Sequence, residues 1–309
     1  IMLSRVANNL YWLDRYMQRS YGLLNIISTN HNSTIDSGDY SSWESIMNSY
    51  MGFKSDKKII SYNDSIKVIE YMLFDYKNPN SLKNIVSKSR ENARSVQEHI
   101  SREVWLSTNK YFLFLNDKST LSNFKKSDPL NFLNKLLQFN LLYYSTSDIT
   151  QERGNAYCFM NVGKYFERII QSIDFLFYKL LKLSEDEKNL QEIVFWKNLL
   201  ISIGGYQLYI KRYKSIFKIE NIIEMILINE NFPRSVKYGV NKLKLHIKRL
   251  NTFNDLKKTD SFFLAEKLEN NLKYNTNKIL NTNGLRFFLD DLIKEINELS
   301  IKINQDYFS

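Results

Sequence analysis

The chain has 309 residues, of which 43% are hydrophobic and 25% charged, so it is expected to be globular and not disordered. One cysteine excludes an intrachain disulfide, and nine glycines with three prolines are too few for a turn-rich all-β fold. The formal net charge of +10 is spread along the chain without a basic block or a zinc-finger spacing, which argues against a specific nucleic-acid partner.

Helical periodicity runs through the whole chain. Apolar side chains recur every three or four positions from residue 3 to residue 28 and again in residues 154–182, so each stretch predicts a long amphipathic helix. No segment alternates between apolar and polar residues for long enough to predict a strand. In chain order, helices are expected at residues 3–28, 43–50, 80–115, 130–144, 154–182, 196–203, 233–251, 259–280 and 285–305, with a loop at 36–39 and a polar stretch at 116–130.

Two stretches of the sequence occur twice. Residues 12–19 return 149 positions later as residues 161–168, and residues 69–82 return 154 positions later as residues 223–236. Pro79 and Pro233, two of the three prolines, therefore occupy equivalent positions. Because proline suits the first turn of a helix and opposes its interior, each predicts the end of one helix and the start of the next.

The repeat and the periodicity together predict an all-α protein, a multi-helix bundle of about ten helices built from two pseudo-equivalent halves. The expected halves are residues 1–148 and residues 149–309, packed as one domain over residues 1–309. Polar residues interrupt the first apolar stretch and later apolar runs are short, so neither a signal peptide nor a membrane span is expected. With a single cysteine, the expected location is the cytoplasm.

Cationic side chains recur on one face of the repeated helices. Arg15 and Arg19 lie four residues apart in the first copy, and Lys164 and Arg168 take their places in the second. Like charges one turn apart disfavour a helix by roughly 0.2–0.5 kcal/mol, so each pair predicts a compensating anion. That anion is either a protein carboxylate in a buried ion-pair network, which is the favoured interpretation, or a carboxylate or phosphate ligand.

The repeated stretches resemble the alpha-E domain, an all-helical family named for a Glu-Arg motif. The matching stretches are LSRVANNLYWLDRY at residues 3–16, RENAR at 90–94, EVW at 103–105, GKYFER at 163–168, GY at 205–206 and FPRSV at 232–236. No activity is established for the family. The resemblance implies a partnership with ATP-grasp-like ligases and transglutaminase-like proteins in a peptide- or amide-forming system.

Two positions depart from the family pattern. Gln18-Arg19 stands where a Glu-Arg pair is expected, and Lys164 stands where an arginine is expected. Glutamine keeps the hydrogen-bonding ability of glutamate but not its charge, so the first copy is interpreted as structural or binding.

Glu167-Arg168 is the intact Glu-Arg pair of the repeat. Adjacent helical residues point about 100° apart, so Glu167 is expected to reach Arg94 or Arg234, and Arg168 to reach Glu103. The resulting candidate network, for ligand binding or for structure, is Arg15, Arg19, Arg94, Glu103, Lys164, Glu167, Arg168, Arg234 and Ser235.

Catalytic signatures do not accompany these residues. None of the three histidines follows a glutamate by three residues and no zinc motif occurs, so no metal and no cofactor are expected. The favoured interpretation is a noncatalytic adaptor or substrate-presenting partner of an ATP-grasp-type ligase. The alternative is an enzyme or receptor that binds an anionic small molecule or peptide carboxylate in a cleft lined by the repeated Arg/Lys faces. Nucleic-acid binding is a weaker alternative.

Overall fold

The computed structural model describes residues 2–38, 40, 43, 44, 46, 47, 64–180, 190–214, 216–256, 258–274 and 282–309. These residues form thirteen α-helices and one 3₁₀ helix at Gln97–His99, and the described part of the chain contains no strand. The all-α class is therefore confirmed, with somewhat more helices than expected. Half of the residues of the helix expected at 43–50, and the end of the helix expected at 259–280, lie outside the described residues. The chain divides into two compact units, at residues 11–12 and again at 152–153.

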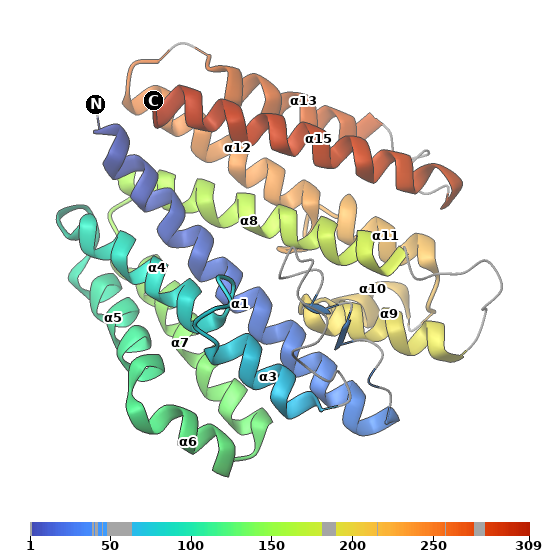
Figure 1. Ribbon diagram of the computed structural model, residues 1–309. Helices are drawn as coiled ribbons and strands as arrows, with labels where there is room; N and C mark the ends of the chain where they lie inside the picture. The colour runs from blue at the N-terminus through green and yellow to red at the C-terminus, as the bar shows by residue number, and fades with distance from the viewer. Residues whose placement is uncertain are drawn as a thin grey trace. The chain divides into compact units, whose positions relative to one another are not determined.

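The N-terminal unit, Trp12–Glu152, is a bundle of helices. Its helices are most of α1 (Ser4–Ser37), then α3 (Ser65–Phe74), α4 (Leu82–Ser95), α5 (Arg102–Asn116), α6 (Lys118–Lys126) and α7 (Pro129–Thr150) (Figure 1). Helix α4 packs on α5, and α5 packs on α7. Helix α1 closes the bundle, because Ser89 of α4 donates to the Leu13 carbonyl at 3.2 Å and Ser20 donates to Asn140 Oδ1 of α7 at 2.6 Å.

The C-terminal unit, Arg153–Ser309 with the residues up to Tyr11, contains a second bundle. Its helices after the start of α1 are α8 (Asn155–Leu180), α9 (Leu190–Ser202), α10 (Tyr206–Tyr213), α11 (Ile219–Leu227), α12 (Val236–Phe253), α13 (Asp260–Tyr274) and α15 (Thr282–Tyr307). Helix α12 packs on α8 and α13, and α15 packs on α13 and α8, which closes a ring of four helices. The Ser4 hydroxyl donates to the Ser309 carbonyl at 3.2 Å, so the start of α1 lies beside the end of the chain.

Both stretches of the internal repeat take the same secondary structure in the two units. The first repeated stretch lies in α1 and in α8, and the second covers the end of α3 or α11, a turn, and the start of α4 or α12. The equivalence of the two halves, expected at residues 1–148 and 149–309, remains a prediction. Their union in one domain remains a prediction.

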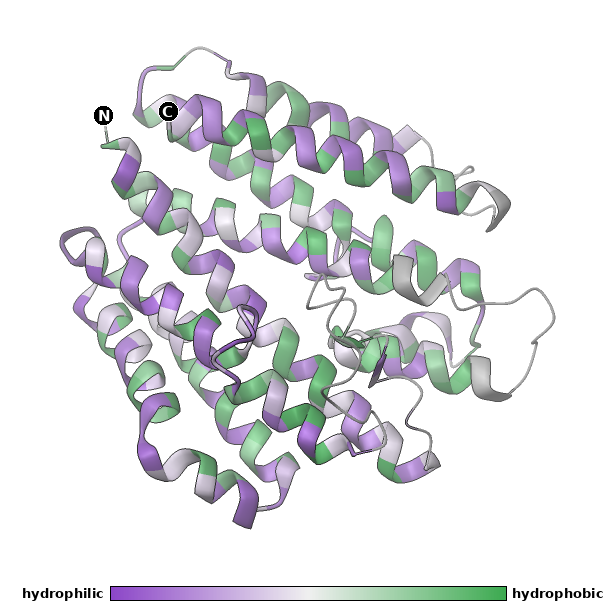
Figure 2. Ribbon diagram, viewed as in Figure 1, coloured by the Kyte–Doolittle hydropathy of each residue, from purple (hydrophilic) through white to green (hydrophobic). Residues whose placement is uncertain are grey.

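Burial of one helix face accounts for the packing of each bundle. Hydrophobic and hydrophilic residues alternate around the long helices (Figure 2). In α8 the buried positions recur every three or four residues, and α12 has the same pattern. The fully buried members are Val162, Phe166, Ile169 and Ile173 in α8, and Val240, Leu243, Ile247 and Leu250 in α12. Each such side chain contributes roughly 1.5–3 kcal/mol when it leaves water.

Several predicted boundaries were wrong for local reasons. The helix expected over residues 80–115 is two helices, because Ser101 accepts the Val104 N–H at 3.2 Å and caps a new helix, α5. The polar stretch at 116–130 contains α6, in which Asp117 accepts the Ser119 N–H at 2.7 Å and the buried Phe124 packs inward. Helix α1 extends through Ser37, into the expected loop, and α9 begins at Leu190 rather than near 196.

Candidate functional site: the repeated motif and the turn that it supports

Helix α8 places the second copy of the motif. Lys164 and Arg168 are four residues apart and share a face, and both are half-buried. Glu167 points away from that face and is 3% exposed. Beside the two cations lies the ring of Tyr165, with Lys164 Nζ 4.9 Å and Arg168 Cζ 5.3 Å from its centroid. The aromatic face offsets part of the like-charge repulsion, since a ring centre attracts cations.

The polar side chains of α8 hold the turn that precedes α12. Arg168 Nη1 donates to the Pro233 carbonyl at 3.2 Å, and the Ser172 hydroxyl donates to the Arg234 carbonyl at 2.7 Å. Arg234 is itself 8% exposed. Two backbone carbonyls before α12 therefore accept hydrogen bonds from side chains of α8. One of the two donors, Arg168, is charged.

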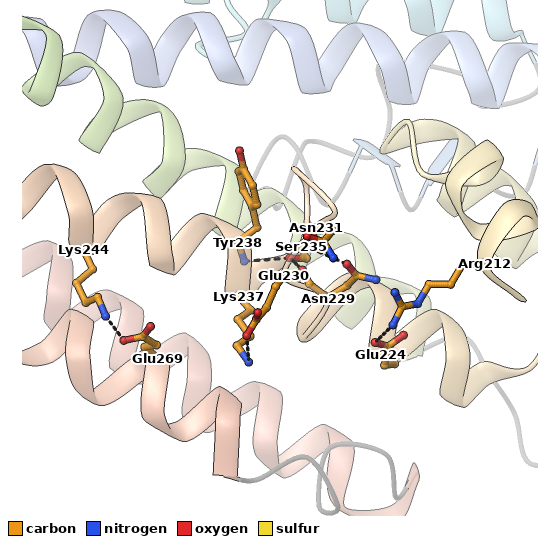
Figure 3. A network of polar contacts seen from close by, with 10 residues as sticks. All are labelled: Arg212, Glu224, Asn229, Glu230, Asn231, Ser235, Lys237, Tyr238, Lys244 and Glu269. Carbon is orange, nitrogen blue, oxygen red and sulfur yellow. Dashed lines mark hydrogen bonds and ion pairs between the residues drawn. The ribbon is translucent and has the colours of Figure 1, made fainter. Parts of the chain in front are cut away.

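The turn also has an internal hydrogen-bond network (Figure 3). Asn229 Oδ1 accepts the N–H groups of Asn231 at 2.9 Å and Phe232 at 3.1 Å, which forms an Asx turn. Ser235 accepts the Tyr238 N–H at 3.0 Å and caps α12, while its hydroxyl donates to the Asn229 carbonyl. Ser235, a predicted site residue, is 1% exposed and serves the helix terminus.

The first copy of the repeat builds the same turn in the N-terminal unit. Asp75 Oδ1 accepts the Lys77 N–H at 2.7 Å, at the position equivalent to Asn229. Ser81 accepts the Asn84 N–H at 3.4 Å and caps α4, as Ser235 caps α12. The second repeated stretch therefore encodes a helix–turn–helix connection with a proline and a serine cap.

Glycine at position 163 permits a close helix crossing within the C-terminal unit. A Cβ atom added to Gly163 would lie 2.0 Å from the carbonyl oxygen of Tyr11 and 2.9 Å from its carbonyl carbon. The start of α1 thus rests directly on the α8 backbone. This crossing explains why a glycine precedes Lys164 in the second copy of the motif.

In helix α1, the arginines of the first copy of the motif lie against aromatic rings. Arg15 is 7% exposed and its Cζ lies 4.4 Å from the centroid of Trp12. Arg19 Cζ lies 5.7 Å from the centroid of Tyr16, and Lys88 Nζ approaches the same ring at 5.7 Å. Both copies of the motif therefore combine paired cations with aromatic faces.

Buried polar residues of the same helix contact α7. Tyr143 donates a short hydrogen bond to the Asp14 carboxylate, and Tyr144 donates to Gln18 Oε1 at 3.5 Å. Burial, reinforced by the Asp14 carboxylate, raises the pKa of Tyr143 well above its usual value. Gln18 is fully buried, so the glutamine that replaces the expected glutamate avoids the desolvation of a charge.

Two predicted site residues lie on the surface of the N-terminal unit. Arg94 is 61% exposed and its Nη1 is 3.7 Å from Glu91, while Glu103 is exposed in the first turn of α5. Their pairing with Glu167 and Arg168 remains a prediction.

In the C-terminal unit, Glu224 approaches Arg212 at 3.4 Å, and burial raises the pKa of Glu224 (Figure 3).

A histidine that the sequence motifs did not single out is buried in the C-terminal unit. His246 of α12 is 5% exposed, and its ring stacks on Tyr165 at 6.0 Å. The sequence pattern that could have indicated His246 is its spacing from Lys242 and Arg249, which share its face of α12.

Arg153, which packs over Tyr157 at 4.2 Å, belongs to a second Glu-Arg dipeptide, Glu152-Arg153.

In the described part of the chain no three His, Cys, Asp or Glu side chains are grouped so that they could hold a metal ion. None of the helices described has the length and apolar character to cross a membrane. Cys158 is buried, and its pKa is raised to about 11 by burial.

Comparison with protein families identifies the family of this chain. The model of the Alpha-E family, described as a predicted alpha-helical domain with a conserved ER motif, matches residues 2–308. Neither the curated proteins nor the solved structures gave a match. Because the family match covers essentially the whole chain, from the start of α1 to the end of α15, the protein belongs to the Alpha-E family.

Proposed function

We propose that this protein is a noncatalytic helical adaptor that presents a substrate or partner to an ATP-grasp-type peptide or amide ligase in the cytoplasm. A transglutaminase-like protein is a further proposed partner. The proposed partners follow from the family resemblance, and the adaptor role follows from the use that the fold makes of the motif.

The adaptor role is supported by the hydrogen bonds that polar side chains near the motif form with the backbone. Arg168, Ser172 and Ser235, on and beside the intact Glu-Arg pair, bind backbone groups of a single turn. Each of these hydrogen bonds commits one donor or acceptor of the side chain to the fold. The motif therefore supports a rigid scaffold, and rigid scaffolds with surface-exposed side chains suit the recognition of another protein.

Affinity purification tests the partnership. The tagged chain, cross-linked in cells of its source and purified under denaturing conditions, is expected to enrich an ATP-grasp-type ligase relative to an equally basic helical protein with the same tag. The matched control guards against capture by net charge alone. Failure to enrich any ligase, with the tag at either end, would contradict the proposal.

A receptor for an anionic ligand is the second candidate. It is favoured by the paired cations and aromatic rings that both copies of the motif present. Turnover or ligand binding by the isolated chain would favour this candidate over the adaptor. Binding of mixed DNA and RNA with a steep salt dependence would instead favour the nucleic-acid alternative.

A further inference from the structure

Helix α12 has two faces of different character. Its inner face is buried where α12 packs on α8 and α13, and consists of Val240, Leu243, Ile247 and Leu250. The opposite side, an arc of about 140° around the helix, carries Lys242, Leu245, Lys248, Arg249 and Phe253. We call these five residues the outer face of α12.

Two large apolar side chains of the outer face are open to solvent. Leu245 is 46% exposed and Phe253 is 45% exposed. They are eight residues apart, which is about 12 Å along a helix. A single exposed apolar side chain needs no explanation. Two on one helix face, with cations beside them, offer a binding segment two points of apolar contact.

The cations of α12 that lie off the outer face are paired. The helix contains five cations and no aspartate or glutamate. Lys237 contacts Glu230 at 2.8 Å, and Lys244 forms an ion pair with Glu269 (Figure 3). The carboxylates that neutralise α12 therefore serve its flanks.

The three cations of the outer face form no ion pair with a carboxylate among the described residues. Lys248 is exposed, and Lys242 Nζ lies 5.4 Å from the ring centroid of Tyr238. Arg249 Cζ lies 5.6 Å from the ring centroid of Phe253, and its Nη2 donates to the Arg153 carbonyl at 2.6 Å. Rings and a carbonyl orient these cations without cancelling their charge.

Acidic residues of the adjacent helix α13 are committed elsewhere. All three pair with lysines outside the outer face, namely Asp260 with Lys302, Glu266 with Lys258 and Glu269 with Lys244. The outer face therefore presents positive charge and apolar side chains together.

We propose that the outer face of α12 docks an acidic amphipathic helix of another protein. Carboxylates of that helix would pair with Lys242, Lys248 and Arg249, and apolar residues seven or eight positions apart would cover Leu245 and Phe253. An apolar centre with a charged rim is the usual composition of a protein–protein interface. The inference holds whether or not the docked protein is a ligase.

The apolar side chains favour a protein over other anionic partners. Interfaces with nucleic acids are more polar, and most of their contacts are made to phosphates and sugars, which Leu245 and Phe253 do not serve. Stable anchoring to a membrane surface needs a larger apolar face than two side chains provide.

Fluorescence anisotropy on the full chain at low salt tests the docking. The probe is a labelled synthetic helix of alanine and glutamate in which leucine recurs every seven residues, and its control has lysine in place of every glutamate. Saturable binding of the acidic probe alone is expected, and it should weaken as salt is added. Equal binding of both peptides, or no saturable binding of the acidic one, would overturn the proposal.

Four surface variants locate the binding. Lys248→Glu should weaken binding of the acidic probe about tenfold, since it replaces attraction by repulsion, and Leu245→Ser should weaken it about fivefold. Their matched controls are Lys110→Glu and Leu106→Ser on α5, where Lys110 is exposed and Leu106 is 49% exposed. Circular dichroism checks that each variant is folded. Losses as large in the controls as in the α12 variants would overturn the assignment to α12.

Cross-linking of the wild-type chain gives a readout without a variant. A benzophenone placed beside a leucine of the acidic probe should attach to residues of α12, as mapped by mass spectrometry, and attachment confined to other helices would contradict the site. Three further measurements test the choice of occupant. Self-association that Leu245→Ser abolishes, in sedimentation equilibrium, would assign the face to a second copy of this chain. Tighter binding of a mixed-sequence oligonucleotide, or of vesicles rich in phosphatidylserine, than of the acidic probe would likewise overturn the choice of a protein helix.

Discussion

Replacing Gly163 by alanine should destabilise the C-terminal unit. The added Cβ would lie 2.0 Å from the Tyr11 carbonyl oxygen, whereas an ordinary contact begins at 3.4 Å, so α1 and α8 would have to move apart. Overpacking costs roughly 1–3 kcal/mol and the backbone of Tyr11 cannot rotate away, so we expect the upper end of that range. Alanine favours a helix over glycine by about 1 kcal/mol, which leaves a net loss of about 2 kcal/mol.

Urea unfolding followed by circular dichroism measures this loss, and a thermal scan should show a fall in Tm of roughly 4–8 °C. Gly239→Ala is the control, because its Cβ would meet a side-chain atom, Ile169 Cγ1, at 2.6 Å, which is a smaller overlap than 2.0 Å against the backbone. We expect a smaller loss for the control. A Gly163→Ala protein as stable as the wild type would refute the close crossing of α1 over α8.

Three further predictions concern caps and buried titratable groups. Ser235→Ala should lower the free energy of unfolding by about 1 kcal/mol or more in urea titrations, because α12 loses its cap and the Asn229 carbonyl loses a donor. Burial raises the pKa of Tyr165 to about 12, so the folded chain keeps this proton up to a higher pH than the unfolded chain does. Stability should therefore be full below about pH 10 and fall as pH rises toward 12, and Tyr165→Phe should reduce that slope. The pKa of His246 is lowered to about 3, so only the unfolded chain gains this proton below about pH 6.5. Stability should then fall from about pH 6.5 toward pH 3, and a His246→Gln protein with an unchanged pH profile would contradict the burial of the neutral ring.

The fold could be predicted from the sequence wherever apolar residues recur with the period of a helix or a proline marks a helix boundary. The amphipathic stripes of α1 and α8 and the turns at Pro79 and Pro233 were of this kind. The break before α5 was missed, because α4 ends at Ser95 and Ser101 caps the next helix without a proline or glycine nearby. The packing partners of a charged residue depend on tertiary contacts, which periodicity does not report.

Part of the candidate site could be predicted, because some of its residues recur in the internal repeat. Lys164, Arg168 and Ser235 stood out because they recur, and the structure gives Arg168 and Ser235 roles in one turn. Arg94 was included by its place in a matching stretch, yet it lies on the surface. His246 was passed over as an isolated histidine, since only packing against α8 brings it beside Tyr157 and Tyr165.

The central claim is that this protein assists a ligase without catalysing a reaction itself. The most direct test is the ATP turnover of three samples, namely the isolated chain, the co-purifying ATP-grasp-type ligase, and the two combined with the ligase's substrate. We predict no turnover by the chain alone and a higher rate of amide formation by the ligase when the chain is present. Turnover by the isolated chain, or a ligase rate that the chain does not change, would contradict the account.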